Sequence, residues 1–140
     1  PDNAFTWFNI GSSLTMLGQY QAATVAFDQS RNTGTQVPFR MLWYQFTPYE
    51  AYYNAGNYAQ VMSLVQATLG TTPFVEETWY WRGLVEAAQG QTDAALKDFD
   101  SVIKFNPGFT SAADAMARVK AGTFVPPTQN GGFARTEPSQ

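Results

Sequence analysis

Apolar and polar residues alternate with the period of an α-helix in the segment that begins near Trp79. Trp79, Gly83 and Ala87 recur every four residues, so they share one face of a helix that we predict over about residues 74–89. Glycine inside a helix costs about 1 kcal/mol relative to alanine. We therefore expect Gly83 to allow the close approach of a neighbouring helix.

The neighbouring helix is predicted over about residues 92–104, where apolar residues recur at spacings of four and three. Ala95 fits opposite Gly83, and Phe99 fills the space beside them. Gly90 supplies the left-handed position that ends the first helix of the pair. One such hairpin has apolar residues on both sides and cannot bury them alone, so we expect neighbouring copies along the chain.

A similar order of residues occurs near the start of the chain. Helices are predicted over about residues 4–17 and 20–31, with Gly18 at the turn between them. The residues that follow the same pattern are Trp7, Ile10, Gly11, Leu14, Gly18, Tyr20, Ala23 and Phe27. This copy predicts a second hairpin of the same kind.

A middle copy is less regular. Its second helix is predicted over about residues 58–69, after a turn at Gly56. Its first helix is predicted within about residues 38–55, with a kink or restart near Thr47, because Pro48 is tolerated at the start of a helix but not inside one. The positions of Ala95, Phe99 and Val102 are taken here by Val61, Val65 and Thr68.

The last part of the chain does not continue the pattern of helical hairpins. One helix with an apolar face is predicted over about residues 109–121, as a cap on the preceding hairpin. Residues 122–140 are rich in Gly, Pro, Thr and Gln and show no period, so we expect a flexible or extended tail.

These copies resemble the tetratricopeptide repeat (TPR) family, whose period of 34 residues separates Gly56 from Gly90. The resemblance implies an all-α fold, a right-handed superhelix of three helical hairpins and a C-terminal capping helix. The implied boundaries are repeats at about 4–37, 38–72 and 73–107, the capping helix at 109–121, a TPR domain of residues 1–121 and a tail of residues 122–140.

In the TPR family the first helices of the pairs line a concave groove that binds a protein or peptide segment. The resemblance carries these groove positions onto Phe5, Phe8, Ser12, Thr15 and Met16, then Trp43, Phe46, Glu50, Tyr53 and Asn54, then Glu77, Tyr80, Leu84, Ala87 and Ala88. The expected partner-binding residues among them are Phe8, Trp43, Phe46, Glu50, Tyr53 and Tyr80. They are mostly aromatic or small, which departs from the Lys, Arg and Asn of the family's carboxylate clamp.

Two segments, residues 41–58 and 72–84, are also similar to the TPR region that follows the catalytic domain in bacterial cysteine peptidase-like proteins of the bacteriocin-processing, papain-like type. The chain has no Cys and no His, so it cannot carry the catalytic pair of that family.

Composition excludes several function classes. Without Cys or His there is no Ser-His-Asp triad, no Cys-His pair and no common zinc site, so we expect neither an enzyme nor a bound metal or cofactor. A net charge of −3 with scattered Lys and Arg argues against nucleic acid. No apolar stretch is long enough to cross a bilayer, so no membrane insertion is expected.

The positions of the Asp and Glu residues can be explained by structural roles. Glu76 and Glu77 follow Pro73, where negative charge favours a helix N-terminus, and Asp98 and Asp100 are expected on a solvated face. Glu50 has two interpretations: it caps its own helix, or it receives a Lys or Arg from a partner in the groove.

Seven aromatic residues lie between Phe39 and Tyr53, more than the buried stripe of one helix can hide. We therefore expect some of them to be exposed as anchors of a protein interface. The favoured function is a non-catalytic protein–protein interaction module with an aromatic-rich concave surface. The alternative is a structural subunit whose copies assemble head to tail into an oligomer or filament.

The polar surface is dominated by neutral residues, with three Lys against fifteen Thr and eleven Gln. This composition slightly favours an extracellular or cell-envelope setting over the cytoplasm. The chain begins at Pro1 rather than at Met, and we expect a processed or excised piece of a longer protein.

Overall fold

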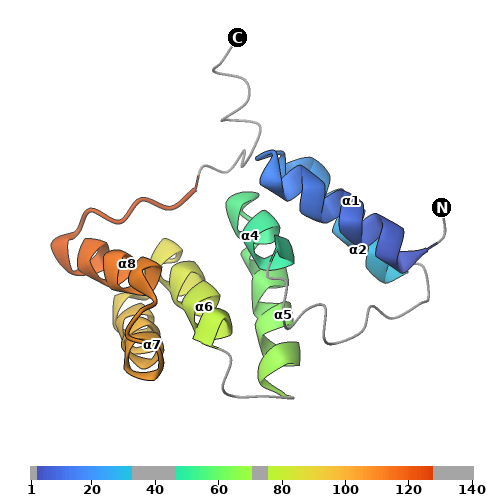
Figure 1. The fold of residues 1–140 in the computed structure, drawn as a ribbon. Helices are drawn as coiled ribbons and strands as arrows, with labels where there is room; N and C mark the ends of the chain where they lie inside the picture. The colour runs from blue at the N-terminus through green and yellow to red at the C-terminus, as the bar shows by residue number, and fades with distance from the viewer. Residues whose placement is uncertain (1–2, 33–46, 71–75, 128–140) are drawn as a thin grey trace, which may run out of the picture. The chain divides into compact units, whose positions relative to one another are not determined.

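The structure is a computed structural model that describes residues 3–32, 47–70 and 76–127 (Figure 1). These residues form helices and no strand. The helices are α1 (Ala4–Met16), α2 (Tyr20–Asn32), α4 (Thr47–Asn54), α5 (Tyr58–Leu69), α6 (Glu76–Ala88), α7 (Thr92–Phe105) and α8 (Thr110–Ala121). The chain divides into two compact units, with α1, α2 and α4 in unit 1 and α5 to α8 in unit 2.

In unit 1, α1 and α2 form a hairpin whose closest contact involves Gly11. A Cβ added there would lie 2.7 Å from the Phe27 ring, so only glycine leaves room for that ring. The far ends of the two helices are joined by the Ser30 hydroxyl, which donates to the Ala4 carbonyl at 2.8 Å. The side chain of Asn3 caps α1 by accepting from the backbone N–H of Phe5 at 2.7 Å.

Helix α4 packs against both helices of that hairpin. The Tyr52 hydroxyl donates to Oδ1 of Asp28 on α2 at 2.6 Å. On the α1 side, the hydroxyls of Ser12 and Thr47 are hydrogen-bonded at 2.9 Å. Tyr49 and Tyr52 are both buried, and α4 therefore uses most of its circumference for packing.

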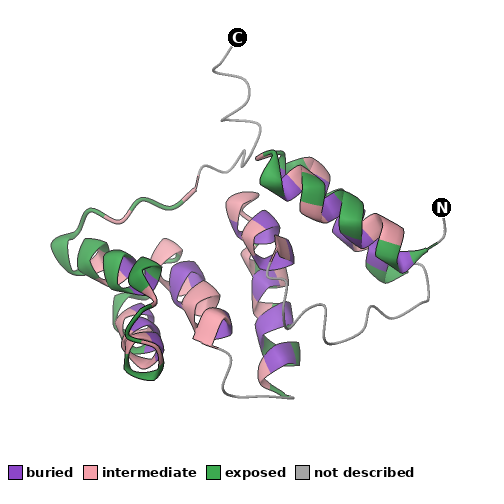
Figure 2. Ribbon diagram, viewed as in Figure 1, coloured by how far each residue is buried: buried purple, intermediate pink, exposed green. Residues whose placement is uncertain are grey.

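Unit 2 contains a hairpin of α6 and α7 that repeats the packing of α1 on α2. A Cβ added to Gly83 would lie 2.6 Å from the ring of Phe99, which is fully buried together with Ala95. Helix α5 packs against α6, and α8 packs against α7. Ala112 and Ala115 are the buried residues of α8, whose outer side is exposed along its length (Figure 2).

The C-terminal ends of α1, α4, α6 and α8 share one hydrogen-bonding pattern. Gly18, Gly56 and Gly90 have φ values of 77°, 79° and 79°. Each donates its N–H to the carbonyl three residues back, and the residue after it donates to the carbonyl five residues before it. This is the Schellman motif, which requires the left-handed conformation that glycine adopts at no steric cost. Gly122 ends α8 in the same way.

Most predicted helices of the described chain are confirmed to within two residues, including the helix over residues 58–69. Helix α4 is described from Thr47 onward, with Pro48 in its first turn, and the expected kink or restart near Thr47 stays a prediction. Residues 38–46 of the predicted first helix of the middle copy lie outside the described residues. The division into three repeats and their right-handed superhelix stay predictions.

Candidate protein-binding surface

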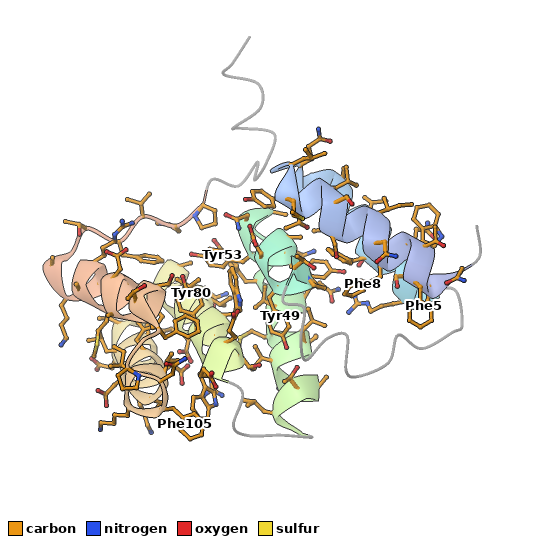
Figure 3. The ribbon with its side chains drawn as sticks, viewed as in Figure 1. Phe5, Phe8, Tyr49, Tyr53, Tyr80 and Phe105 are labelled. Atoms are coloured by element: carbon orange, nitrogen blue, oxygen red, sulfur yellow. The ribbon has the colours of Figure 1, made fainter. Side chains whose placement is uncertain are left out.

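The groove positions of α1 divide into exposed and buried residues. Phe5 and Met16, three helical turns apart on one face, are 39% and 84% exposed. Phe5 projects from the first turn of α1 (Figure 3). Phe8, by contrast, is 2% exposed because its ring packs edge-on against Phe27 of α2 at a centroid distance of 5.3 Å. In this structure Phe8 is therefore a packing residue rather than an accessible anchor.

The groove positions of α4 combine one carboxylate, one amide and one buried aromatic side chain. Glu50 is half-buried in the first turn of α4, and the Tyr20 hydroxyl donates to its Oε2 at 3.5 Å. The side-chain amide of Asn54 donates to the Glu50 carbonyl at 2.8 Å. Tyr53 is 7% exposed. Glu50 thus has the helix-terminal position expected of a capping carboxylate, and it also keeps part of its surface accessible.

In the first helix of the middle copy, the three described aromatics are packing residues, and the expectation that some of its seven aromatics are exposed stays a prediction. Tyr49, Tyr52 and Tyr53 are all buried, because α4 is covered by α2 on one side and by α1 on another. A single apolar stripe is the rule for a helix with one neighbour, whereas α4 has two. The other four aromatics of that cluster, among them the predicted binding residues Trp43 and Phe46, lie outside the described residues.

In unit 2 the predicted binding residue Tyr80 is half-buried within a group of rings. Its ring centroid lies 5.1 Å from that of Phe109, 5.4 Å from that of Trp81 and 6.2 Å from that of Phe99. Figure 3 shows Tyr80 on α6. Phe109 immediately precedes α8, so the α7–α8 connection covers one side of Tyr80. Tyr80 thus has a packing role and an accessible edge.

An ion pair that the sequence analysis missed joins α6 to α7. Arg82 donates to both carboxylate oxygens of Asp98, at 2.8 Å from Nε and 2.7 Å from Nη2. The Asp98 side chain is 8% exposed, so its predicted place on a solvated face is wrong. Asp100, its partner in that prediction, does keep an exposed place, where Lys104 pairs with it at 2.9 Å. Residue spacing alone gave no sign that an arginine sixteen positions earlier would lie opposite Asp98.

Glu86 stands next to this ion pair, one turn after Arg82. Burial and the neighbouring Asp98 carboxyl raise the pKa of Glu86, while Arg82 opposes that rise. One of its oxygens, Oε1, is buried without a hydrogen-bond donor. The same Asp98 carboxylate raises the pKa of Arg82 above its ordinary value. The group links two helices, because Arg82 of α6 donates to both carboxylate oxygens of Asp98 on α7.

The described residues hold no group of three or more Asp, Glu, His or Cys side chains that could bind a metal ion. Across those same residues, no helix is long and apolar enough to cross a membrane.

The two helical hairpins, each with a glycine against a phenylalanine and a Schellman turn between its helices, define an all-α helical-repeat fold. Residues 77–108, which contain the α6–α7 hairpin, match the family model described as tetratricopeptide repeat, and this match supports a TPR-family protein. Neither the curated proteins nor the solved structures contain a match to the chain. TPR repeats generally mediate protein–protein interactions.

Proposed function

We propose that this chain is a non-catalytic protein–protein interaction module that recognises a protein segment through the groove positions of its first helices. The observation that carries the proposal is the exposure of Phe5 and Met16 on one face of α1. Large apolar side chains that stay exposed in a folded chain are the usual anchors of protein interfaces.

The charges of the groove positions indicate the chemistry of the partner. Glu50 and Glu77 are the charged residues among the groove positions, and no Lys or Arg accompanies them. Such a surface does not bind an acidic C-terminus, which needs cationic side chains. The partner that fits is an apolar segment with a neutral or basic flank, whose Lys or Arg meets Glu50.

The proposal is tested by selecting peptides from a random library with the full chain and measuring the affinity of the selected peptide by fluorescence anisotropy. The double variant Phe5→Ala/Met16→Ala is expected to bind at least tenfold more weakly, about 1.4 kcal/mol. Val25→Ala, at an exposed position on α2, is the matched control and should bind as the unaltered chain does. Selection of no peptide, or equal binding by the double variant, overturns the proposal.

The setting of the module is part of the same proposal. Similarity of residues 41–58 and 72–84 to the TPR region of bacteriocin-processing-type peptidase proteins suggests a bacterial chain that works beside a catalytic domain. The scarcity of Lys suggests an extracellular or cell-envelope location. Head-to-tail assembly of copies of the chain into an oligomer or filament is the alternative function.

A further inference from the structure

Met16, the last residue of α1, is the most exposed of the large apolar side chains in the described part of the chain, at 84%. Met62 on α5 and Met116 on α8 are half-buried, and Met41 lies outside the described residues. The chain has no Cys, so the thioether of methionine is the side-chain group that mild peroxide oxidises first. Because the oxidant reaches an exposed sulfur most readily, Met16 is the methionine that should react before Met62 and Met116.

The turn at the end of α1 does not require a methionine. It is closed by backbone hydrogen bonds, and the same bonds close the turns at Gly56 and Gly90. In those two turns Asn54 and Ala88 stand in the place of Met16. A side chain that the turn does not need and that solvent surrounds can change its chemistry without disturbing the fold. An oxygen atom added to the Met16 sulfur should therefore leave α1 and its turn intact.

The same change alters the groove face that Met16 shares with Phe5. A thioether is apolar and adaptable, which suits it to packing against an apolar segment of a partner. A sulfoxide is polar, and its oxygen is a hydrogen-bond acceptor that costs free energy when it is buried without a donor. Oxidation thus removes an apolar anchor from the groove face while the helix that carries it stays folded.

We infer that Met16 is a reversible oxidation site that regulates binding at the groove positions of α1. In the forward step the Met16 sulfur takes one oxygen from a peroxide: the O–O bond breaks, the sulfur is oxidised by two electrons and one water is released. In the reverse step a methionine sulfoxide reductase transfers two electrons from thiols, which form a disulfide, and the oxygen leaves as water. The reduced chain binds the partner and the oxidised chain releases it.

Peptide mapping by tandem mass spectrometry tests the site. After limited treatment of the full chain with hydrogen peroxide, sulfoxide should form at Met16 at least about three times faster than at Met62 or Met116. Circular dichroism of the same samples should show unchanged helix content. Equal rates at these methionines, or loss of helix while only Met16 is oxidised, overturns the inference.

Fluorescence anisotropy with a peptide that the groove selects, and that itself contains no Met or Cys, tests the regulation. Peroxide should weaken binding by at least about fivefold, and methionine sulfoxide reductase with dithiothreitol should restore it. Met16→Leu, whatever its affinity before treatment, should keep that affinity after peroxide, and Met16→Gln should bind as weakly as the oxidised chain. Met116→Leu is the matched control and should still lose binding. Unchanged binding by the oxidised chain, or an equal loss in Met16→Leu, overturns the inference.

This regulation rests on the proposed function, and the two fail in different ways. A peptide whose binding needs Phe5 and Met16 but survives oxidation overturns the regulation and leaves the groove proposal standing. Selection of no peptide overturns both together, whereas the peptide map shows in either case whether Met16 is the residue that peroxide oxidises.

Discussion

Phe99 lies so close to Gly83 that a Cβ on the glycine would come within 2.6 Å of its ring, and Phe27 stands in the same relation to Gly11 at 2.7 Å. Each ring lies against the bare backbone of the opposite helix. The spacing of the two helices in both hairpins is thus set by the absence of a side chain at one position.

Gly83→Ala should therefore destabilise the protein. Helix propensity alone favours alanine by about 1 kcal/mol, whereas overpacking against a fully buried ring costs about 1–3 kcal/mol. We expect the steric cost to dominate, because the clash is with a core ring that has no free space to move into. Urea unfolding followed by circular dichroism measures the loss as a lower midpoint.

The double variant Gly83→Ala/Phe99→Leu separates the two effects, because the smaller leucine makes room for the new methyl group. Its loss of stability should be less than the sum of the two single losses. Gly90→Ala is the matched control: nothing lies within 4 Å of its would-be Cβ, so its loss comes from the positive φ and Phe99→Leu should not relieve it. A stabilising Gly83→Ala would contradict the packing argument.

Asp98→Asn should be far more damaging than Asp100→Asn. Asp98 is buried with both oxygens bound by Arg82, so its replacement leaves a cation without its partner, at a cost on the order of 2–3 kcal/mol for a half-exposed arginine. Asp100 pairs at the surface with the exposed Lys104, and its replacement should leave the unfolding midpoint almost unchanged. Equal effects in urea unfolding would mean that the Arg82 ion pair is dispensable.

Stability should fall as the pH rises from about 5 to 9, through the pKa of Glu86. Burial and Asp98 raise this pKa from 4.5 to about 8, so the folded chain keeps a proton that the unfolded chain has already lost. The stabilisation that protonated Glu86 contributes is fully present below its ordinary pKa of 4.5, and it is lost as the pH rises through the raised pKa of about 8. Unfolding midpoints at several pH values measure the slope.

Glu86→Gln should remove this pH dependence, since glutamine resembles the protonated acid at every pH. The stability of Glu86→Gln relative to that of the unaltered chain should therefore increase from pH 5 to 9. Glu77→Gln, in the first turn of the same helix, provides the control and should retain the slope. A slope that survives in Glu86→Gln would assign the titration to another group.

Tyr52→Phe should loosen α4 from α2. The Tyr52 hydroxyl donates to the Asp28 carboxylate at 2.6 Å, and hydrogen bonds to a charged partner contribute about 1.5–3 kcal/mol. Burial and this bond raise the pKa of Tyr52, so the hydroxyl remains a donor over the whole physiological range. A double-mutant cycle with Asp28→Ala, followed by thermal unfolding, measures the coupling. Additive effects would show that the bond does not stabilise the fold.

The features that were predicted correctly are local ones. Turn glycines such as Gly90 and the bounds of the helices follow from residues close together in the chain, and the contact of Gly83 with the next helix follows from spacing alone. Val61, Val65 and Thr68 are buried as their positions in the repeat indicate.

The features that were missed depend on neighbours that the sequence does not name. Phe8 and Tyr53 are expected groove residues, yet both are buried: Phe8 packs against the Phe27 ring, and Tyr53 lies on α4, which has two packing partners. Asp98 is expected in solvent but is buried, because amphipathic spacing does not reveal its salt bridge to Arg82 on another helix. Such contacts depend on which faces of two helices meet, and residue spacing within each helix cannot specify that.

The Schellman turns at Gly18, Gly56 and Gly90 use only backbone groups within six residues of one another. Because such a turn depends only on neighbouring backbone groups, a hairpin together with its turn glycine is a transferable unit. Gene duplication can lengthen an array of such units, and a protein engineer can do the same by joining whole units at 34-residue intervals. The interval between Gly18 and Gly56 is 38 residues instead of 34, so this junction departs from the regular repeat length.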